Sequence, residues 1–135
     1  MSVVINHVIV HCHNKEESAA FMATILGLPE PSTFHRFQVV RLDNGATLDF
    51  LDSPEEEIVW EHFAFLVGES DFNAILGRIQ ARNIPFWSDP FGKIPDQINT
   101  DDGGRSIYFR DPNNHLLEIL TVPYGGDRLA AKYTT

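Results

Sequence analysis

Four residues of types that bind metal ions stand at matching places in the two halves of the sequence. His7 and His62 each lie at the start of an apolar run, in NHVIV and EHFAF. Asp49 and Glu118 each interrupt a later apolar run, in TLDFL and LLEIL. A carboxylate inside a sheet must be neutralised, paired or bound to a metal, because burying it alone costs too much free energy. Two imidazoles with one or two carboxylates suit a divalent ion such as Fe, Mn, Ni, Co or Zn.

The elements that must position these residues repeat along the chain. Periodicity and turn residues predict, in order, a strand (3–12), a helix (14–27), two strands (36–42 and 46–52), then a strand (60–67), a helix (70–82), a short extended segment (84–88) and two strands (105–110 and 115–122). Turns are predicted at 43–45 and 111–114. If the halves pack around a pseudo-twofold axis, the four side chains converge on one point.

The composition limits the class of protein and its partners. With 135 residues, of which 43% are hydrophobic, the chain is typical of one globular domain with its own core. A net charge of −9 without a basic patch argues against nucleic acid as a partner. No leader and no membrane-length apolar run is visible. Cys12 is the only cysteine and is expected to be a small strand hydrophobe. We therefore expect a cytoplasmic protein without membrane or nucleic-acid partners.

Three stretches carry a family resemblance that covers nearly the whole chain: INHVIV, EHFAFLV and GRSIYFRDPNNHLLEIL. They resemble the vicinal oxygen chelate superfamily, which includes glyoxalase I, extradiol dioxygenases, fosfomycin-resistance enzymes, bleomycin-binding proteins and methylmalonyl-CoA epimerase. The resemblance implies an α+β glyoxalase fold, in which two βαβββ modules form a cupped mixed sheet around a metal site. One domain would then span 1–135, with modules at about 1–53 and 58–123 and a short polar tail.

The same resemblance assigns the metal ligands. The family's ligand positions match His7, His62 and Glu118, and Asp49 stands where glyoxalase I-like members place a fourth carboxylate. One divalent metal ion would bind a small oxygen-rich substrate through neighbouring oxygens and act as a Lewis acid. In glyoxalase I-like and epimerase-like members a metal-bound carboxylate, here Glu118 or Asp49, acts as the general base.

Residues near Glu118 leave several reactions open. Tyr108 matches the active-site tyrosine of extradiol dioxygenases, but NTDDGG (99–104) stands where those enzymes carry a histidine. Ser106 and Tyr108 match positions that line the phosphonate pocket of fosfomycin-resistance enzymes, but Ile9 replaces their threonine.

Positive charge for an anionic substrate is available in the same region, from Arg105, Arg110 and Lys93.

We therefore predict a homodimeric, divalent-metal-dependent enzyme that acts by lyase, isomerase or epimerase-type proton transfer. The predicted catalytic residues are Glu118, Asp49 and Tyr108, and the predicted substrate contacts are Ser106, Tyr108 and Arg105. Fosfomycin-type epoxide opening and extradiol ring cleavage are the alternative reactions. A bleomycin-type drug-binding dimer without metal is the alternative from another class, and the complete ligand set argues against it.

Overall fold

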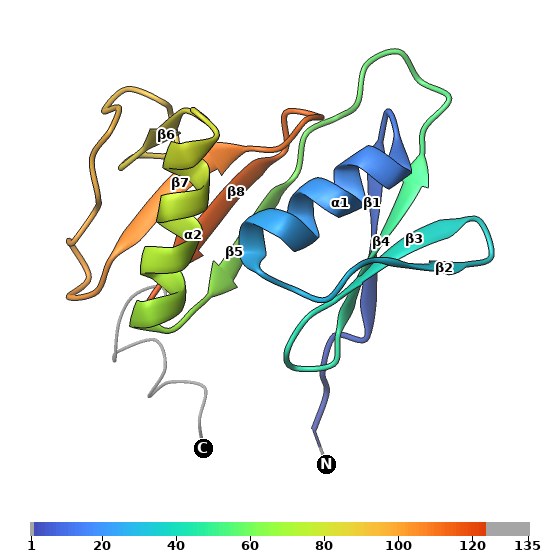
Figure 1. Cartoon of the computed structure of the whole chain (residues 1–135), viewed down its shortest axis with the longest axis horizontal. Coiled ribbons are helices and arrows are strands. Elements are labelled where there is room, and N and C mark those ends of the chain that lie inside the picture. The colour runs from blue at the N-terminus through green and yellow to red at the C-terminus, as the bar shows by residue number, and fades with distance from the viewer. Residues whose placement is uncertain (1, 124–135) are drawn as a thin grey trace. The chain divides into compact units, whose positions relative to one another are not determined.

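Each half of the chain folds into one helix and one four-stranded sheet, in the same order of elements (Figure 1). The structure, a computed structural model, describes residues 2–123. These residues form two units: unit 1 (2–60 with Asp111–Asn114) and unit 2 (Glu61–Arg110 with 115–123). The predicted polar tail after Pro123 lies outside the described residues.

The elements of the two units correspond one to one. Unit 1 holds β1 (His7–Cys12), α1 (Lys15–Leu26), β2 (Ser32–Phe34), β3 (Phe37–Arg41) and β4 (Thr47–Asp52). Unit 2 holds β5 (His62–Leu66), α2 (Glu69–Ala81), β6 (Phe86–Trp87), β7 (Ser106–Arg110) and β8 (Leu116–Leu120). Among residues 2–123, no helix has the length and apolar character needed to cross a membrane.

Local sequence explains where α1 begins and ends. The Asn14 side chain accepts a hydrogen bond from the N–H of Glu17 at 2.9 Å, which satisfies a donor that the first helical turn leaves free. Gly27 ends the helix with a left-handed φ of 71°, a conformation that glycine adopts without strain. The predicted ends of this helix are confirmed.

Strand order is the same in both sheets: β1-β4-β3-β2 in unit 1 and β5-β8-β7-β6 in unit 2. The first and last strands of each unit are parallel neighbours, and the other neighbouring strands are antiparallel. Parallel neighbours need a crossover connection, which includes α1 in unit 1 and α2 in unit 2. The predicted α+β class with two βαβββ modules is confirmed.

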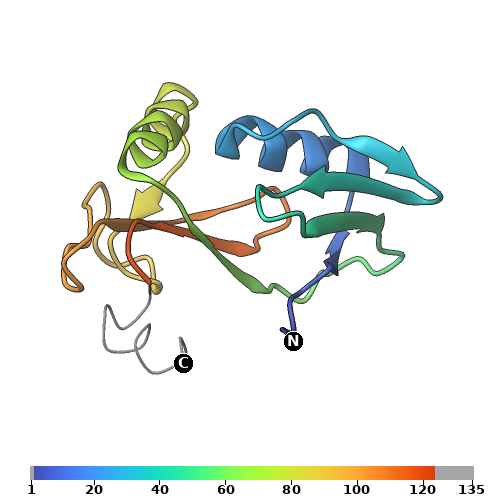
Figure 2. The ribbon, with the colours of Figure 1, turned by 90° about the horizontal axis from the view of Figure 1, so that it is seen from below.

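Because strand side chains alternate, each sheet has a buried face and an opposite face that holds the predicted metal ligands. On the buried face lie Val10, Cys12, Val40 and Phe50 in unit 1, and Ile107, Phe109, Leu117 and Ile119 in unit 2. Each helix lies along one face of its own sheet (Figure 2). Because successive strand residues point to opposite faces, His7, Asp49, His62 and Glu118 lie on the face opposite these buried residues.

Two strands differ from the sequence prediction. The first strand begins at His7 rather than at residue 3, because its partner β4 begins at Thr47. The N–H of Thr47 still binds the carbonyl of Asn6 at 3.0 Å, and the residues before Asn6 extend past the end of β4. The strand β2 is not predicted by the sequence, because its three exposed residues carry no apolar alternation.

The predicted turn between β7 and β8 is present, and two of its four side chains are buried within unit 1. Asp111 and Asn113 are 6% and 5% exposed. The Asn113 side chain accepts a hydrogen bond from the N–H of His13 at 2.8 Å. It donates to Ser18 Oγ at 2.9 Å and to Asp111 Oδ2 at 3.0 Å. These bonds satisfy polar groups that burial removes from water, so the turn is an anchored part of the interior of unit 1.

We expect Asn113→Ala to lower the free energy of unfolding by about 2 kcal/mol, because the buried Ser18 and Asp111 side chains lose a hydrogen-bond partner. Urea unfolding measures this change. Asn73→Ala, at an exposed position of α2, is the matched control and should change stability by less than about 0.5 kcal/mol. Equal effects of the two substitutions would contradict the anchoring role of Asn113.

Cys12 is fully buried, as its expected role as a strand hydrophobe requires. Burial raises the pKa of its thiol to about 11, and the Asp52 carboxylate adds to the rise. Since the thiolate is the reactive form, only about one molecule in a thousand is reactive at pH 8. We expect a disulfide-exchange reagent to leave Cys12 unmodified in the folded protein and to label it fully in urea. Rapid stoichiometric labelling of the folded protein would be the opposite result.

Candidate active site

The pairing register gives each unit an equivalent histidine–carboxylate pair. The strand partners of the two carboxylates are Ile9 for Asp49 and Ala64 for Glu118. His7 and His62 each stand two residues before that partner, on the same side of their strand. The two pairs are therefore equivalent in the register of their own sheets.

In unit 2, His62 and Glu118 are in direct contact. His62 Nε2 lies 3.2 Å from Glu118 Oε1, and His62 Nδ1 lies 3.0 Å from the carbonyl oxygen of Leu116. A carbonyl only accepts, so a neutral ring carries its proton on Nδ1 and presents a lone pair at Nε2. A lone pair that faces a carboxylate is repelled unless a proton or a metal cation lies between them. Metal-binding histidines are commonly oriented in this way, through the nitrogen that does not bind the metal.

The surroundings of Glu118 favour its neutral form. The residue is 6% exposed, and burial is the main cause that raises its pKa above the ordinary value. The neighbouring His62 and a hydrogen bond with Tyr108 lower the pKa, and the Asp102 carboxylate raises it further. A divalent cation supplies the opposite charge that a buried carboxylate lacks, so this position suits a metal ligand.

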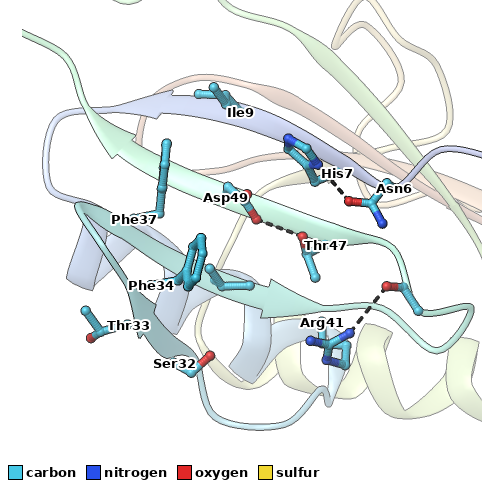
Figure 3. Close-up of a pocket in the computed structure, with 12 residues that line it drawn as sticks. Asn6, His7, Ile9, Ser32, Thr33, Phe34, Phe37, Arg41, Thr47 and Asp49 are labelled. Atoms are coloured by element: carbon cyan, nitrogen blue, oxygen red, sulfur yellow. Dashed lines mark hydrogen bonds between the residues drawn. The ribbon is translucent and has the colours of Figure 1, made fainter.

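The pair in unit 1 has the same type of arrangement. His7 Nδ1 lies 2.8 Å from the side-chain oxygen of Asn6, which leaves Nε2 for a ligand. Asp49 is 9% exposed, and its Oδ1 accepts a hydrogen bond from the Thr47 hydroxyl at 2.8 Å. Both side chains are drawn on the β1–β4 strand pair in Figure 3.

The donor atoms fit a divalent metal ion. Within either unit, residues 2–123 contain no group of three or more His, Cys, Asp and Glu side chains that could hold one. Each unit supplies one imidazole, oriented through Nδ1, and one largely buried carboxylate. These donor types match those of catalytic metal sites. The four-ligand set His7, Asp49, His62 and Glu118, with two residues from each unit, stays a prediction.

A cavity of about 260 Å³, the unit 2 cavity, opens beside Glu118. Its lining includes Arg105, Ser106 and Tyr108, which the sequence predicts as site residues. Tyr108 is the strand partner of Glu118, and its ring stacks with that of His62 at 6.2 Å between centroids and 27° between planes. Unit 2 therefore brings the candidate residues of the second module together around one carboxylate.

The unit 2 cavity is predominantly acidic. One arginine, Arg105, lines it with three carboxylate residues: Asp101, Asp102 and Glu118. The guanidinium of Arg105 is paired with a carboxylate, since its Nη2 lies 2.7 Å from Glu69 Oε2. Its Cζ also lies 4.3 Å from the centroid of the Phe72 ring. This cavity therefore accommodates a cation better than an anion.

Unit 1 has a larger cavity of about 470 Å³, the unit 1 cavity, which the sequence does not predict (Figure 3). His7 and Asp49 line it together with Phe34, Phe37 and Arg41. Phe37 and Arg41 share strand parity with Val39, the partner of Asp49, so the register carries a signal for them. Phe34 has no such signal, because it lies on the strand that the sequence does not predict.

Comparison with known proteins identifies the fold. No family model matches the chain. The solved structure of oxidase ChaP-H1 is 49% identical, with a TM-score of 0.89 over 93% of this chain and 100% of that one. Oxidase ChaP-H2 is 50% identical, with a TM-score of 0.89 over 93% and 98% of the two chains. A glyoxalase/dioxygenase from Nostoc punctiforme, 21% identical, shares the fold with a TM-score of 0.68 over 89% and 91%. The chain is thus built like proteins of the two-module glyoxalase class.

Two relatives match by sequence and define the family. The metallothiol transferase FosB of Shouchella clausii (strain KSM-K16) is 30% identical over 122 residues, which are 87% of this chain and 79% of that protein. The glutathione transferase FosA of Serratia marcescens is 27% identical over 128 residues, 85% and 78% of the two chains. The chain belongs to the vicinal oxygen chelate superfamily. Enzymes of this superfamily use a divalent metal ion, which is the cofactor that the sequence predicts.

The raised pKa of Glu118 predicts how stability depends on pH in the metal-free protein. The native state holds this proton to higher pH than the unfolded chain does, so stability is lost as the pH rises through the raised pKa. Glu118→Gln does not ionise. We expect it to raise the melting temperature of metal-free protein at about pH 8 but not at about pH 4. A divalent ion should stabilise the wild type and not this variant.

Differential scanning calorimetry with and without added metal measures both effects. Glu57→Gln, at an exposed position, is the matched control and should behave as the wild type at both pH values. Metal-dependent stabilisation that survives in Glu118→Gln would remove Glu118 from the ligand set.

Proposed function

We propose that this protein is a divalent-metal-dependent oxidase that acts on a small substrate with neighbouring oxygen atoms. The substrate loses two electrons and two protons, and dioxygen accepts them to give hydrogen peroxide. The observation that carries the proposal is the identity of 49% and 50% to two oxidases over 93% of the chain. The sequence alone favours proton transfer of the lyase or isomerase type. Oxidation of a hydroxyl-bearing substrate also requires proton removal, so the same carboxylates serve either reaction.

His7, Asp49, His62 and Glu118 are the proposed metal ligands. The ion, once bound, supplies Lewis acidity to two neighbouring substrate oxygens. The orientation of both imidazoles through Nδ1, at 2.8 Å in His7 and 3.0 Å in His62, supports their assignment as ligands through Nε2.

Glu118 and Tyr108 are the residues proposed to move the substrate proton. The hydrogen bond between the tyrosine and the carboxylate connects the unit 2 cavity to a group whose pKa is raised by burial. A base with a raised pKa accepts a proton from a hydroxyl more readily than an ordinary carboxylate does. Ser106, on the same cavity wall, is proposed to orient a substrate oxygen, and Asp49 is the alternative base.

Fosfomycin-type epoxide opening is the second candidate function, favoured by the relatives FosA and FosB. The charge of the unit 2 cavity argues against it, since a phosphonate needs cations. Arg105 is bonded to Glu69, and neither Lys93 nor Arg110 lines the cavity. The acidic lining therefore favours the oxidase over the fosfomycin-modifying enzyme.

We also propose a cytoplasmic homodimer with a small-molecule substrate. Proteins of this family are dimeric, which supports the homodimer. The one cysteine of the sequence, Cys12, is free and buried, which supports a reducing compartment.

Oxygen consumption distinguishes the candidate reactions. Untagged protein is loaded separately with Fe, Mn, Ni, Co or Zn and offered 2,3-dihydroxynaphthalene, a glutathione hemithioacetal, or fosfomycin with a thiol. We expect oxygen uptake with the aromatic diol for at least one metal, a product that has lost two hydrogen atoms, and peroxide. The rate should fall by at least about a hundredfold in His62→Ala, because a metal ligand is lost.

Three results would point elsewhere. A product that gains both atoms of dioxygen would identify ring cleavage. Oxygen-independent turnover of the hemithioacetal would identify proton transfer, and turnover of fosfomycin would identify the second candidate. Gln80→Ala, at an exposed position of α2, controls for handling and should keep the wild-type rate.

A further inference from the structure

The two units carry equivalent rows of side chains with different chemistry. The row that contains the carboxylate is Ala64, Glu118 and Tyr108 in unit 2, and Ile9, Asp49 and Val39 in unit 1. Unit 1 thus has a branched apolar side chain, Val39, where unit 2 has the phenol of Tyr108. The opposite flank of the carboxylate is also larger and more apolar in unit 1, with Ile9 in place of Ala64. The unit 1 cavity therefore offers a bound molecule more apolar surroundings than the unit 2 cavity does.

Two phenylalanines extend this apolar surface. Phe34 and Phe37 are the closing pair of the β2–β3 hairpin, on either side of a turn in which His35 has a φ of 52°. The guanidinium of Arg36 lies 5.6 Å from the Phe37 ring centroid. The carbonyl of Arg36 accepts a hydrogen bond from Lys15 Nζ at 2.8 Å. The hairpin tip is therefore hydrogen-bonded to a side chain of the first turn of α1.

Large apolar side chains are left open on the wall of the unit 1 cavity. Phe34 is 60% exposed and Ile9 is 44% exposed, whereas Asp49, the strand partner of Ile9, is 9% exposed. Exposed apolar surface beside a buried polar group marks a binding site more often than a plain surface does. The volume of about 470 Å³ lies within the range of small-molecule sites, roughly 300–1,000 Å³.

The chemistry of the walls identifies the class of molecule. Phenylalanine rings bind another flat ring in offset or edge contact more favourably than buried area alone explains. The remaining wall carries the imidazole of His7, the carboxylate of Asp49 and the guanidinium of Arg41, which suit oxygen atoms or a metal that binds them. A molecule that satisfies both walls has a planar aromatic ring system with oxygens along one edge.

We propose that the unit 1 cavity binds the aromatic ring system of the substrate, and that Phe34 and Phe37 select planar aromatic compounds with neighbouring oxygens over aliphatic ones. That the bound compound is turned over rests on the proposed function. That the cavity binds an aromatic ring rests on unit 1 alone.

The test measures binding of 2,3-dihydroxynaphthalene to metal-free full-length protein by the fluorescence of the probe. We expect Phe34→Ala and Phe37→Ala each to raise the Kd roughly fivefold to tenfold, because each removes one ring from the wall. Phe91→Ala is the matched control, since Phe91 is 79% exposed in unit 2 and lines neither cavity. Lactate, an aliphatic compound with neighbouring oxygens, should fail to displace the probe.

The outcomes separate this inference from the proposed function. An unchanged Kd in both phenylalanine variants overturns the inference, and oxygen uptake by metal-loaded wild type then still supports the oxidase. Weakened probe binding without oxygen uptake for any metal supports the ring site and overturns the oxidase. If Phe34→Ala changes the oligomeric state and leaves the Kd unchanged, the surface is a contact between copies and the inference is overturned.

A second variant keeps the test decisive if Phe34→Ala does not fold. Phe34→Leu keeps an apolar side chain and removes the ring, so it should retain the wild-type melting temperature and still weaken probe binding. If Phe34→Ala does not fold, the Kd of Phe34→Leu decides between the same outcomes. An unchanged Kd in Phe34→Leu, together with one in Phe37→Ala, overturns the inference.

Discussion

The parallel pairing of the first and last strands in each unit is the constraint on which the candidate site depends. It places a histidine and a carboxylate on one face of a sheet although they lie far apart in the sequence. Strand side chains alternate, so a slip of one residue would move every side chain to the opposite face. In β8 such a slip would carry Glu118 to the face where Leu117 and Ile119 are fully buried. The apolar residues that β8 buries thus hold the carboxylate in its place.

Burial of Glu118 carries an electrostatic cost to the stability of unit 2. Its burial raises its pKa, and the carboxyl therefore weakens the metal-free fold at neutral pH. Elsewhere the interior is well satisfied: none of the buried side-chain nitrogen and oxygen atoms in residues 2–123 lacks a hydrogen-bond partner. The network around Asn113 illustrates this, because each of its polar atoms meets a complementary group. The electrostatic cost is therefore local to the position where a cation would remove it.

Much of the fold follows from local sequence, because short-range rules determine it. Asn14 and Gly27 define α1 through their own backbone and side-chain preferences, and the apolar runs around Asp49 and Glu118 define the central strands. The sequence does not predict the strand β2, because its three exposed residues pair through the backbone and show no pattern of side chains. The burial of Asn113 is equally invisible, because it depends on Ser18 and His13, which are distant in sequence.

The candidate site divides in the same way. His7, His62 and Glu118 are identifiable because family motifs surround them, and Tyr108 and Ser106 because they match family positions in the last of these motifs. The structure adds that Tyr108 is the strand partner of Glu118. The wall formed by Phe34 and Phe37 depends on a hairpin that the sequence does not predict. Nothing in a linear sequence distinguishes a phenylalanine on a cavity wall from one in a core. Site residues on central strands are therefore predictable here, and those on the edge hairpin are not.

Because the two modules are equivalent in strand order, the side chains at equivalent positions can be compared directly. Arg41 and Arg110 stand at equivalent positions, each paired with the strand partner of the unit's histidine. Val39 and Tyr108 are also equivalent, each paired with the unit's carboxylate, but their side chains differ. Strand order is the same in both units, so these side-chain differences fall at equivalent places. The connections differ as well: the β2–β3 hairpin lines the unit 1 cavity, and the longer segment between β6 and β7 lines the unit 2 cavity. A phenol beside the carboxylate of unit 2 supports the proposal that this module moves the substrate proton. An aliphatic group beside the carboxylate of unit 1 supports the proposal that this module holds an apolar ring.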